Sequence, residues 1–416
     1  MNGKDNMQAI AFLVGDSGVV LWGLSSRERL RRQCRGLELP VSAAPPDAAA
    51  SGDCLLLRCD YLFELRTIAS LLDRADFLLC DPDTGDIAAA RVPGERAAAL
   101  HALMQQQFVA TAQTRHEQPD VIDDTACDGL TRGAPGDLGD YDLTLRRSQP
   151  PMLERLDASR AGQLEDQLYG DAYKGITDLV TKWLWPRPAK RLVRVCAAWN
   201  ISPNQVTSIS FLLVVASAVL FYRGEFALGL LSGWIMTLLD TVDGKLARVR
   251  VQSSHFGHLF DHGIDLIHPP FWYLFWALGL SGAGETIDIG MTATLIFSGY
   301  AAGRFAELAF QKLCGGSLFA WRPFDSWFRL VTARRNPCLV ILTVAVLLGA
   351  PEAGLWGVVV WTVFTSMILW LRVTQAVSAR RQRGGNLPAW FESPEAVRAH
   401  PRSHRLFSGT RGAYRA

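Results

Sequence analysis

Four carboxylates lie between positions 240 and 265 of this 416-residue chain, flanked by two strongly apolar segments. Ionisable side chains are costly next to lipid, so such a cluster indicates a functional site by default. Carboxylate oxygens suit Mg²⁺ or Mn²⁺ better than Zn²⁺. Two such ions about 4 Å apart can stabilise both the entering and the leaving oxygen of a displacement at phosphorus. The four carboxylates are Asp240, Asp243, Asp261 and Asp265.

The spacing of these aspartates predicts two helical faces that meet. The first two are three residues apart and the last two are four residues apart, so each pair projects from one side of its helix. Gly244 and Gly257 would allow a phosphate to approach the backbone closely. Arg248 offers a planar fork for phosphate oxygens. A solvated acidic loop at a membrane surface is the plain alternative, but it does not account for this spacing.

Apolar segments of nearly spanning length dominate the chain beyond residue 200. They predict six transmembrane helices, near 207–222, 226–241, 264–281, 287–303, 337–350 and 354–372. Lysine and arginine gather in the connections on one side, whereas the opposite loops contain only Arg223. The positive-inside rule therefore predicts an inner-membrane protein whose two termini and four aspartates face the cytoplasm. A transporter would show internal repeats and ionisable residues at mid-membrane, and the sequence shows neither pattern.

Composition predicts a soluble α/β N-terminal domain followed by an all-α polytopic membrane domain. In the first domain, short apolar runs near 8–14, 54–59 and 76–80 predict strands, and 25–35 and 94–112 predict helices. Basic and Gly/Pro-rich composition near the C-terminus predicts loose order near the headgroups. The predicted parts are a cytoplasmic α/β domain (1–145), a linker with amphipathic interfacial helices (146–200), the six-helix membrane domain (201–377) and a basic, loosely ordered cytoplasmic tail (378–416).

Overall charge and cysteine content narrow the function classes. The formal net charge of +2 does not indicate a general polyanion-binding protein, so no nucleic-acid partner is expected. The eight cysteines show no CxxC pair and no framework spacing, which favours a reducing compartment over a secreted disulfide scaffold. The first 30 residues lack the pattern of a signal peptide.

The cluster at 240–265 resembles the signature of the class I CDP-alcohol phosphatidyltransferases, D-x₂-D-G-x₂-A-R-x₈-G-x₃-D-x₃-D, and fills each of its positions. The likeness covers about 200–375. It implies transfer of a substituted phosphate from a CDP-alcohol to an acceptor hydroxyl, with release of CMP and with two Mg²⁺ or Mn²⁺ ions. By this resemblance the four aspartates are the metal ligands, and Asp265 is also the catalytic base. The implied nucleotide-binding residues are Gly244, Ala247, Arg248, Gly257, Asn204 and Thr207.

The acceptor side of the site is less constrained by the sequence. Relatives that use a phosphorylated acceptor bind its phosphate with basic residues of later helices, and Arg304, Arg334 and Arg335 stand in corresponding connections. The alternative is that these arginines extend to anionic headgroups. Four histidines near the motif are interpreted as loop and interface residues, because Mg²⁺ prefers oxygen and their spacing matches no zinc pattern. They are His255, His258, His262 and His268.

The first 145 residues contain a second, thinner resemblance. The stretch from Ile10 to Gly18 resembles the opening of sugar-nucleotidyltransferase domains, which some family members carry to make the CDP-alcohol. The glycine-rich turn lacks the basic residue that would bind a triphosphate, and the domain is short. Asp60, after an apolar run, resembles the metal aspartate of that fold, although an aspartate at the end of a strand is commonplace. We therefore interpret the domain as a degenerate, non-catalytic nucleotidyltransferase-like fold.

Three hypotheses about function remain open at this point. In the first, the product is a phospholipid, with a lipid as donor or acceptor. In the second, both alcohols are polar, as in fused relatives that join CDP-inositol to inositol phosphate. In the third, the protein is a non-catalytic membrane scaffold. The expected partners are a CDP-alcohol donor, a hydroxyl acceptor, the bilayer and, by the resemblance, a second copy of the chain in a homodimer.

Overall fold

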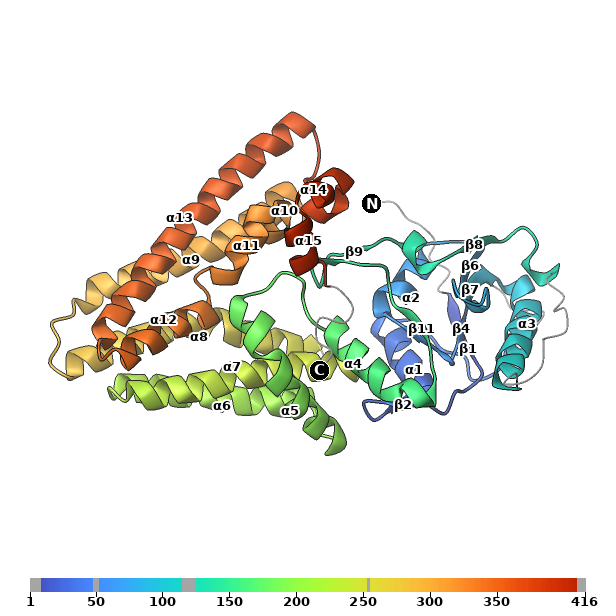
Figure 1. Ribbon diagram of the computed structural model, residues 1–416, viewed down its shortest axis with the longest axis horizontal. Coiled ribbons are helices and arrows are strands. Elements are labelled where there is room, and N and C mark those ends of the chain that lie inside the picture. The colour runs from blue at the N-terminus through green and yellow to red at the C-terminus, as the bar shows by residue number, and fades with distance from the viewer. Residues whose placement is uncertain (1–8, 48–51, 114–124, 253–254, 410–416) are drawn as a thin grey trace. The chain divides into compact units, whose positions relative to one another are not determined.

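The computed structural model describes residues 9–47, 52–113, 125–252 and 255–409, and the chain divides into two compact units (Figure 1). The N-terminal unit comprises residues 1–142 and 149–168. The C-terminal unit comprises residues 143–148 and 169–416. The first is an α/β fold and the second is mainly helical, as the composition predicts.

A mixed five-stranded sheet forms the centre of the N-terminal unit. Its order is β1-β4-β7-β6-β8, with β1 parallel to β4, β6 parallel to β8, and β7 antiparallel to both of its neighbours. The three predicted strands are confirmed, but β7 and β8 were not predicted. Strand β7 is rich in alanine, which has low strand propensity. The bounds are β1 Ile10–Val14, β4 Asp53–Arg58, β6 Phe77–Cys80, β7 Ile87–Pro93 and β8 Thr131–Gly133.

Helices cover both faces of this sheet. Helices α1 (Ser26–Gly36) and α2 (Leu65–Leu72) pack on one face, where Leu30 and Ile68 join the buried core. Helix α3 (Gly94–Gln113) packs on the other face, where Leu100 and Met104 are fully buried. Two apolar layers therefore enclose the sheet, as expected for an α/β domain.

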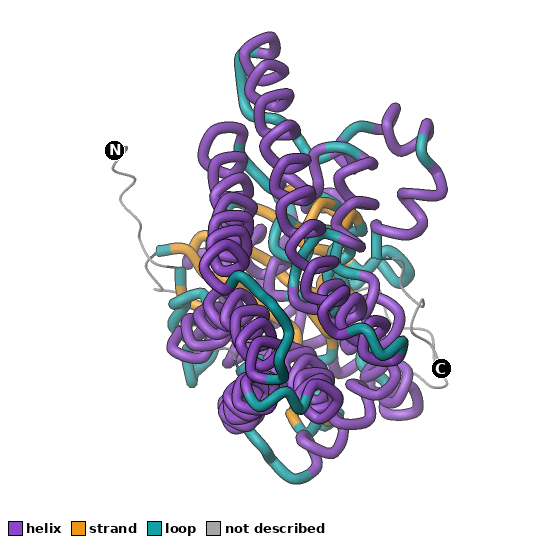
Figure 2. The backbone as a smooth tube through the Cα atoms, turned by 90° about the vertical axis from the view of Figure 1, so that its left-hand side faces the viewer, coloured by secondary structure: helices purple, strands orange, loops and turns teal. Residues whose placement is uncertain are grey.

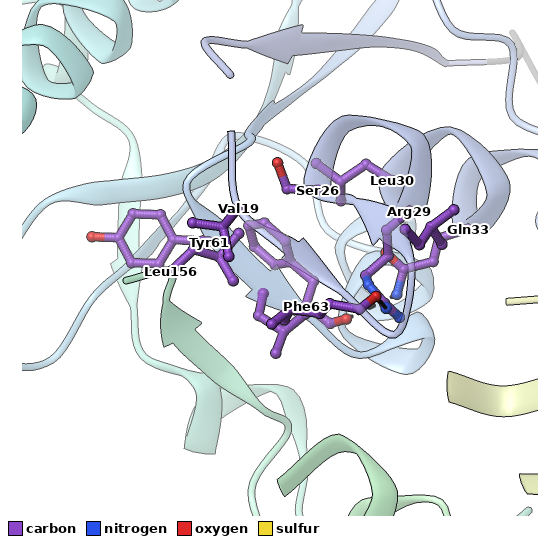
Figure 3. Close-up of a pocket in the computed structure, with 11 residues that line it drawn as sticks. Val19, Ser26, Arg29, Leu30, Gln33, Tyr61, Phe63 and Leu156 are labelled. Carbon is purple, nitrogen blue, oxygen red and sulfur yellow. Dashed lines mark hydrogen bonds between the residues drawn. The ribbon is translucent and has the colours of Figure 1, made fainter. Parts of the chain in front are cut away.

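Short elements complete the N-terminal unit. Strands β2 (Val20–Leu21) and β3 (Leu24–Ser25) form a hairpin, and β5 (Tyr61–Phe63) pairs antiparallel with β11 (Leu153–Arg155). A small cavity beside them is lined by Arg29, Gln33 and Phe63, among others (Figure 3). It has room for no more than about one water molecule. The other elements are η1 (Thr125–Cys127), η2 (Pro135–Leu138), β9 (Tyr141–Asp142), η3 (Ala158–Arg160) and α4 (Ala161–Asp171), whose last turn belongs to the C-terminal unit.

Long helices build the C-terminal unit, and each predicted apolar segment corresponds to one of them (Figure 2). Ser202 caps the first with its side chain, and Pro203 occupies the first helical position, as the Ser-Pro-Asn sequence favours. The helices are α6 (Pro203–Tyr222), α7 (Phe226–Val249), α8 (His255–Gly282), α9 (Ile289–Cys314), α12 (Arg335–Leu347) and α13 (Pro351–Arg383).

Only part of the predicted membrane topology is confirmed. In the described residues, α6, α7 and α13 are long and apolar enough to cross a membrane. A fourth candidate is the pair α11 (Pro323–Val331) and α12, which is bent by 45° at a short break. Helices α8 and α9 do not meet the same criterion, so six spans remain a prediction.

Aromatic side chains and close helix approaches hold this helical unit together. Trp272 of α8 is buried, contacts the Phe221 ring edge-on and donates from its indole nitrogen to the Val214 carbonyl at 3.0 Å. Gly279 allows α8 to approach the end of α6, because a Cβ there would overlap the Phe221 carbonyl oxygen. Indole donors of this kind need a partner when buried, which fixes helix register as well as contact area.

The end of the chain is more structured than its composition predicts. After α13, helices η5 (Trp390–Glu392), α14 (Pro394–Ala399) and α15 (Pro401–Phe407) follow. Phe407 is fully buried, and Ser403 accepts a hydrogen bond from the Trp327 indole at 3.0 Å. The expectation of a loosely ordered tail is therefore wrong for residues 390–408, because apolar anchors dock this segment on α11. The remaining elements are β10 (Arg147–Ser148), η4 (Val180–Leu184, a π-helix), α5 (Pro186–Ala198) and α10 (Leu318–Trp321).

Candidate active site

Asp240 and Asp243 lie in the second half of α7, where the helix changes from apolar to polar residues. Asp243 is buried, and its Oδ2 accepts a hydrogen bond of 2.6 Å from the Thr207 hydroxyl of α6. Thr207 also lies 3.1 Å from the Pro203 carbonyl oxygen, so it joins the first turn of α6 to the signature helix. A hydroxyl has one proton to donate, and the shorter contact favours the carboxylate.

Arg335, the first residue of α12, contacts carboxylates of two helices. Its Nη2 lies 2.6 Å from Oδ2 of Asp240, and its Nη1 donates to Oδ1 of Asp265 in α8. The Asp265 side chain is 44% exposed, whereas that of Asp240 is 19% exposed. The structure therefore brings together one aspartate from each predicted pair, as the spacing predicted. It also places Arg335 against the predicted metal ligands.

Part of the signature lies outside the described side chains. The backbone of α8 places Asp261 one turn before Asp265, but its side chain is among those not described, as are those of His255, His258 and His262. His268 is described: it is buried within α8, and its Nδ1 lies 2.6 Å from the carbonyl oxygen of residue 264. His268 is thus a helix residue, not a loop residue.

The predicted nucleotide-binding residues are distributed over α6, α7 and α8. Gly244 lies in α7, and a Cβ at this position would have only the Arg248 guanidinium within 4 Å, at 3.7 Å. Arg248 donates to the Ala172 carbonyl oxygen at 3.2 Å. Asn204 is exposed in the first turn of α6. Ala247 follows on α7, and Gly257 lies in the first turn of α8. The role of these six residues in nucleotide binding stays a prediction.

Two of the three predicted acceptor arginines, Arg304 and Arg334, form ion pairs with an acid that was not predicted from the sequence. Glu307 of α9 lies 2.7 Å from Nη2 of Arg304 and also pairs with Arg334. Arg335 contacts the aspartates instead, so the three arginines divide between two carboxylate groups. The i,i+3 spacing of Arg304 and Glu307 was a signal that could have identified this pair.

The residues present fit a divalent cation. Asp240 and Asp265 both contact the Arg335 guanidinium, so they are neighbours across two helices. Their donors are all oxygen, the set that Mg²⁺ and Mn²⁺ prefer. Among the described side chains, which exclude Asp261, no group of three or more histidine, cysteine, aspartate or glutamate residues could hold a metal ion.

Comparison with known proteins identifies the domain. Residues 200–383 match the family described as CDP-alcohol phosphatidyltransferase. The chain carries a CDP-alcohol phosphatidyltransferase domain. Members of this family use CDP-alcohol donors with alcohol or lipid acceptors, and they generally depend on a divalent metal. The match covers α6 to α13, and it confirms the resemblance seen in the signature.

Named relatives of the CDP-alcohol phosphatidyltransferase domain come from bacteria, archaea and animals. The bifunctional IPC transferase and DIPP synthase of Rubrobacter xylanophilus is 31% identical over 37% of this chain and 33% of its own length. Cholinephosphotransferase 1 of Danio rerio is 30% identical over 28% of this chain and 32% of its own. The archaetidylinositol phosphate synthase of Pyrococcus horikoshii is 26% identical over 47% and 93%. The matched part thus spans about a third of the first two relatives.

Residues before the CDP-alcohol phosphatidyltransferase domain also contact its signature helix, and they were not predicted from the sequence. Lys245 of α7 lies 3.6 Å from the centre of the Tyr173 ring and donates to the Ala172 carbonyl oxygen at 2.9 Å. Arg248 donates to the same carbonyl. The segment at 172–173 is therefore part of the site's surroundings. No local pattern marks it, because its contacts are 70 or more residues away in the chain.

Proposed function

We propose that this protein is an integral membrane CDP-alcohol phosphotransferase that acts in phospholipid synthesis. It moves a substituted phosphate from a CDP-alcohol to an acceptor hydroxyl and releases CMP. The observation that carries the proposal is the convergence of Asp240 and Asp265 from two helices on the Arg335 guanidinium, within a complete family signature. The relatives' names support transfer chemistry of this class.

The proposed metal ligands are Asp240, Asp243, Asp261 and Asp265. Bound Mg²⁺ or Mn²⁺ ions would neutralise charge on the phosphates of the donor and on the departing CMP. The Thr207 hydroxyl holds Asp243 in place through a hydrogen bond to its Oδ2. The proposed nucleotide-binding residues are Gly244, Ala247, Arg248, Gly257, Asn204 and Thr207.

Asp265 is the proposed base. It is the most exposed of the described site aspartates, so a substrate hydroxyl can reach it. The carboxylate takes the proton of the acceptor hydroxyl as that oxygen forms a bond to the phosphorus beside the donor alcohol. The anhydride bond to the CMP phosphate breaks at the same phosphorus, and its electron pair leaves with CMP. The reaction consumes one CDP-alcohol and one alcohol and needs no oxidant or reductant.

Substitution of the two α8 aspartates tests this mechanism. We expect Asp265→Asn and Asp261→Asn to abolish CMP release by detergent-solubilised protein supplied with candidate CDP-alcohols and Mn²⁺. Asp288→Asn is the matched control, because Asp288 caps α9 through Met291 N and asparagine caps equally well. Undiminished turnover by either α8 variant would falsify the assignment. Elution volume and thermal unfolding would show that each variant is folded.

The same incubation distinguishes the classes of substrate. An organic-soluble product indicates a lipid donor or acceptor, and an aqueous product indicates two polar alcohols, as in transfer from CDP-inositol to inositol phosphate. No CMP with any donor favours a non-catalytic membrane scaffold. The proposed acceptor residues are Arg304, Arg334 and Arg335. Arg335 contacts the aspartates, and Arg304 and Arg334 meet at Glu307 of α9.

The proposed topology has six spans, with the site and both termini on the cytoplasmic side of the cell membrane. It rests on the distribution of lysine and arginine between the connections. A homodimer is proposed by family resemblance. Cysteines introduced in the loops near 223 and 350 test the topology. A membrane-impermeant thiol reagent should label them when it is added on the side opposite the cytoplasm, and should not label them when it is added on the cytoplasmic side.

The N-terminal unit is proposed to be a non-catalytic nucleotidyltransferase-like domain. Asp60, which stands in the place of a metal aspartate, is paired with the buried Arg58 at 2.7 Å and 3.0 Å. Burial lowers the pKa of the Arg58 guanidinium, but the hydrogen bonds and the charge of Asp60 hold this pKa above its ordinary value. The glycine-rich turn is also engaged internally, because Arg27 donates to the Gly15 carbonyl at 3.0 Å. CTP-dependent formation of a CDP-alcohol would contradict this proposal.

A further inference from the structure

Four cations gather in the C-terminal unit, and two of them precede the CDP-alcohol phosphatidyltransferase domain. Arg146 lies in the turn before β10, and Lys174 lies in the connector between α4 and η4. Arg329 belongs to α11, and Arg334 immediately precedes α12. We name this set the connector cation cluster. Only Arg334 was predicted from the sequence.

Packing of the connector accounts for the position of Arg146 and Lys174. A Cβ on Gly175 would lie 2.6 Å from the Arg146 carbonyl oxygen, so the connector lies directly against the turn that carries Arg146. One residue before Tyr173, the Ala172 carbonyl accepts hydrogen bonds from Lys245 and Arg248 of α7. The connector therefore bridges the turn and the signature helix, with Lys174 between these two contacts.

Arg329 and Arg334 share one aromatic ring. Their guanidinium carbons lie 5.5 Å and 5.8 Å from the centre of the Phe319 ring. Arg329 is 8% exposed, and its Nε and Nη1 are buried without a hydrogen-bond partner among the described residues. Buried guanidinium donors are costly when unpaired, so this arginine points to an anion as partner.

Two acids lie beside the cluster, and each is shared with groups outside it. Glu307 pairs with Arg304 as well as with Arg334. Asp178 accepts hydrogen bonds from Thr181 N at 2.9 Å and from the Asn336 amide at 3.0 Å. The charge of Asp178 also acts on Arg329. The positive charges that act on Lys174 are those of Arg146, Arg248, Arg329 and Arg334.

Among the residues that the structure describes, the cations of the cluster therefore outnumber the acids beside it. Burial first, and these positive charges with it, lower the pKa of the Lys174 amine to about 7. A lysine is held in such a state at a cost, unless an anion restores its proton and its charge. A doubly charged oxyanion meets both needs, because it accepts hydrogen bonds from several donors at once.

We infer that the connector cation cluster binds a phosphate monoester group, through Lys174 and Arg329 above all. The inference rests on the proposed function for its meaning: the bound group would be carried by the acceptor alcohol or by an anionic lipid at the cytoplasmic surface. In the first case, the segment before the family domain selects the acceptor. Arg334 links this site to Glu307 and the proposed acceptor arginines.

Binding is tested on the full-length protein in detergent, without donor substrate. Thermal unfolding is followed against inorganic phosphate, with sodium chloride at matched ionic strength as reference. We expect phosphate to stabilise the wild type, and Lys174→Gln and Arg329→Gln each to weaken its apparent affinity about tenfold. Arg381→Gln, which changes an exposed arginine near the end of α13, is the matched control and should keep full affinity.

Two further arms separate the sources of the phosphate. Phosphatidic acid in mixed micelles, compared with phosphatidylcholine, reports a lipid headgroup, whereas stabilisation by inorganic phosphate alone reports a soluble phosphorylated alcohol. The Asp265→Asn variant should lose CMP release but keep phosphate binding, so failure of one proposal is distinguishable from failure of the other. Should Arg329→Gln not fold, Lys174→Gln decides. Equal phosphate affinity in wild type and Lys174→Gln, or no response to either ligand, overturns the inference.

Discussion

At the scale of single residues, ion pairs and a hydrogen bond position the charged side chains of the site. Asp243 is fixed by a hydroxyl, Asp240 and Asp265 share a guanidinium, and Glu307 joins two arginines. Charges buried near a membrane are tolerated when they are paired in this way.

Thr207 is a positioning residue for Asp243. We expect Thr207→Val to raise the Mn²⁺ concentration needed for half-maximal CMP release about tenfold, because loss of a hydrogen bond to a metal ligand typically has that effect. Thr207→Ser should restore the wild-type value, since it keeps the hydroxyl. Ser208→Ala is the control: its hydroxyl lies 2.9 Å from the Asn204 carbonyl of the same helix. The same Mn²⁺ requirement in Thr207→Val and wild type would refute this role.

Lys174 predicts a pH-dependent stability. Burial and the charges of Arg146, Arg248, Arg329 and Arg334 lower its pKa to about 7 in the folded protein, below the value of 10.5 for a free lysine. The unfolded chain therefore binds the extra proton between these two values, and stability rises with pH across that window. Without phosphate, Lys174→Met should raise the melting temperature most below pH 7, and less towards pH 9.

Measurement of melting temperatures at pH 6, 7, 8 and 9 tests this sign. Lys312→Met, which changes an exposed lysine near the end of α9, should shift the melting temperature by a similar small amount at each pH. A difference between Lys174→Met and wild type that grows with pH would show that the lysine is stabilised in its charged form.

At the scale of elements, close approach of helices decides the geometry of the site. Helices α6, α7 and α8 pack against each other, and they carry Thr207, Asp240 and Asp265 respectively. Their contact depends on small residues and on buried indole donors. A backbone shift of less than an ångström in this group would separate the aspartates from their partners.

Gly279 provides the sharpest test of this packing. A Cβ at this position would overlap the Phe221 carbonyl oxygen, a backbone atom that cannot move away cheaply. We expect Gly279→Ala to lower the unfolding free energy by about 1–3 kcal/mol and to reduce activity, because overpacking displaces α8 from α6. Gly282→Ala in the same helix meets no atom within 4 Å and should leave thermal unfolding in detergent nearly unchanged. Equal melting temperatures for the two variants would contradict the packing.

At the scale of the whole molecule, the two units have separate cores. The N-terminal unit is organised around its sheet. Arg58, the last residue of β4, is fully buried and has Asp60 and Asp86 as partners at 2.7 Å and 3.5 Å. The C-terminal unit is organised around its aromatic helices. Each unit should therefore respond to core mutations on its own.

Arg58→Met should unfold the N-terminal unit and spare transferase activity. Removing one partner of a buried ion pair costs about 3–5 kcal/mol, because it leaves the carboxylate uncompensated. Limited proteolysis should show faster cleavage within residues 1–142, with CMP release retained. Arg32→Met removes only a half-exposed pair with Glu28 and should change neither. Loss of CMP release in Arg58→Met would indicate that the transferase depends on the N-terminal unit.

Much of the architecture was predictable, because periodicity and local spacing report on single elements. The six long helices and three of the sheet strands follow from apolar patterns. Strand β7 did not, because its alanines carry no strand preference and only pairing with β4 and β6 makes it a strand. The docked helices after residue 390 were missed because basic composition conceals a few apolar anchors such as Phe407.

The sequence by itself determined the family of the domain at 200–383, because the aspartate signature lies within single helices and can be recognised without the fold. The proposed reaction type follows from that family resemblance. Only the tertiary structure decided which charges meet. It placed Arg335 between Asp240 and Asp265, and it brought the segment at 172–173 against the signature helix. Such contacts join residues 70 to 95 positions apart, and they depend on helix packing and side-chain reach. No local pattern encodes them, because a side chain's neighbours across the fold are set by the whole core and not by its own segment.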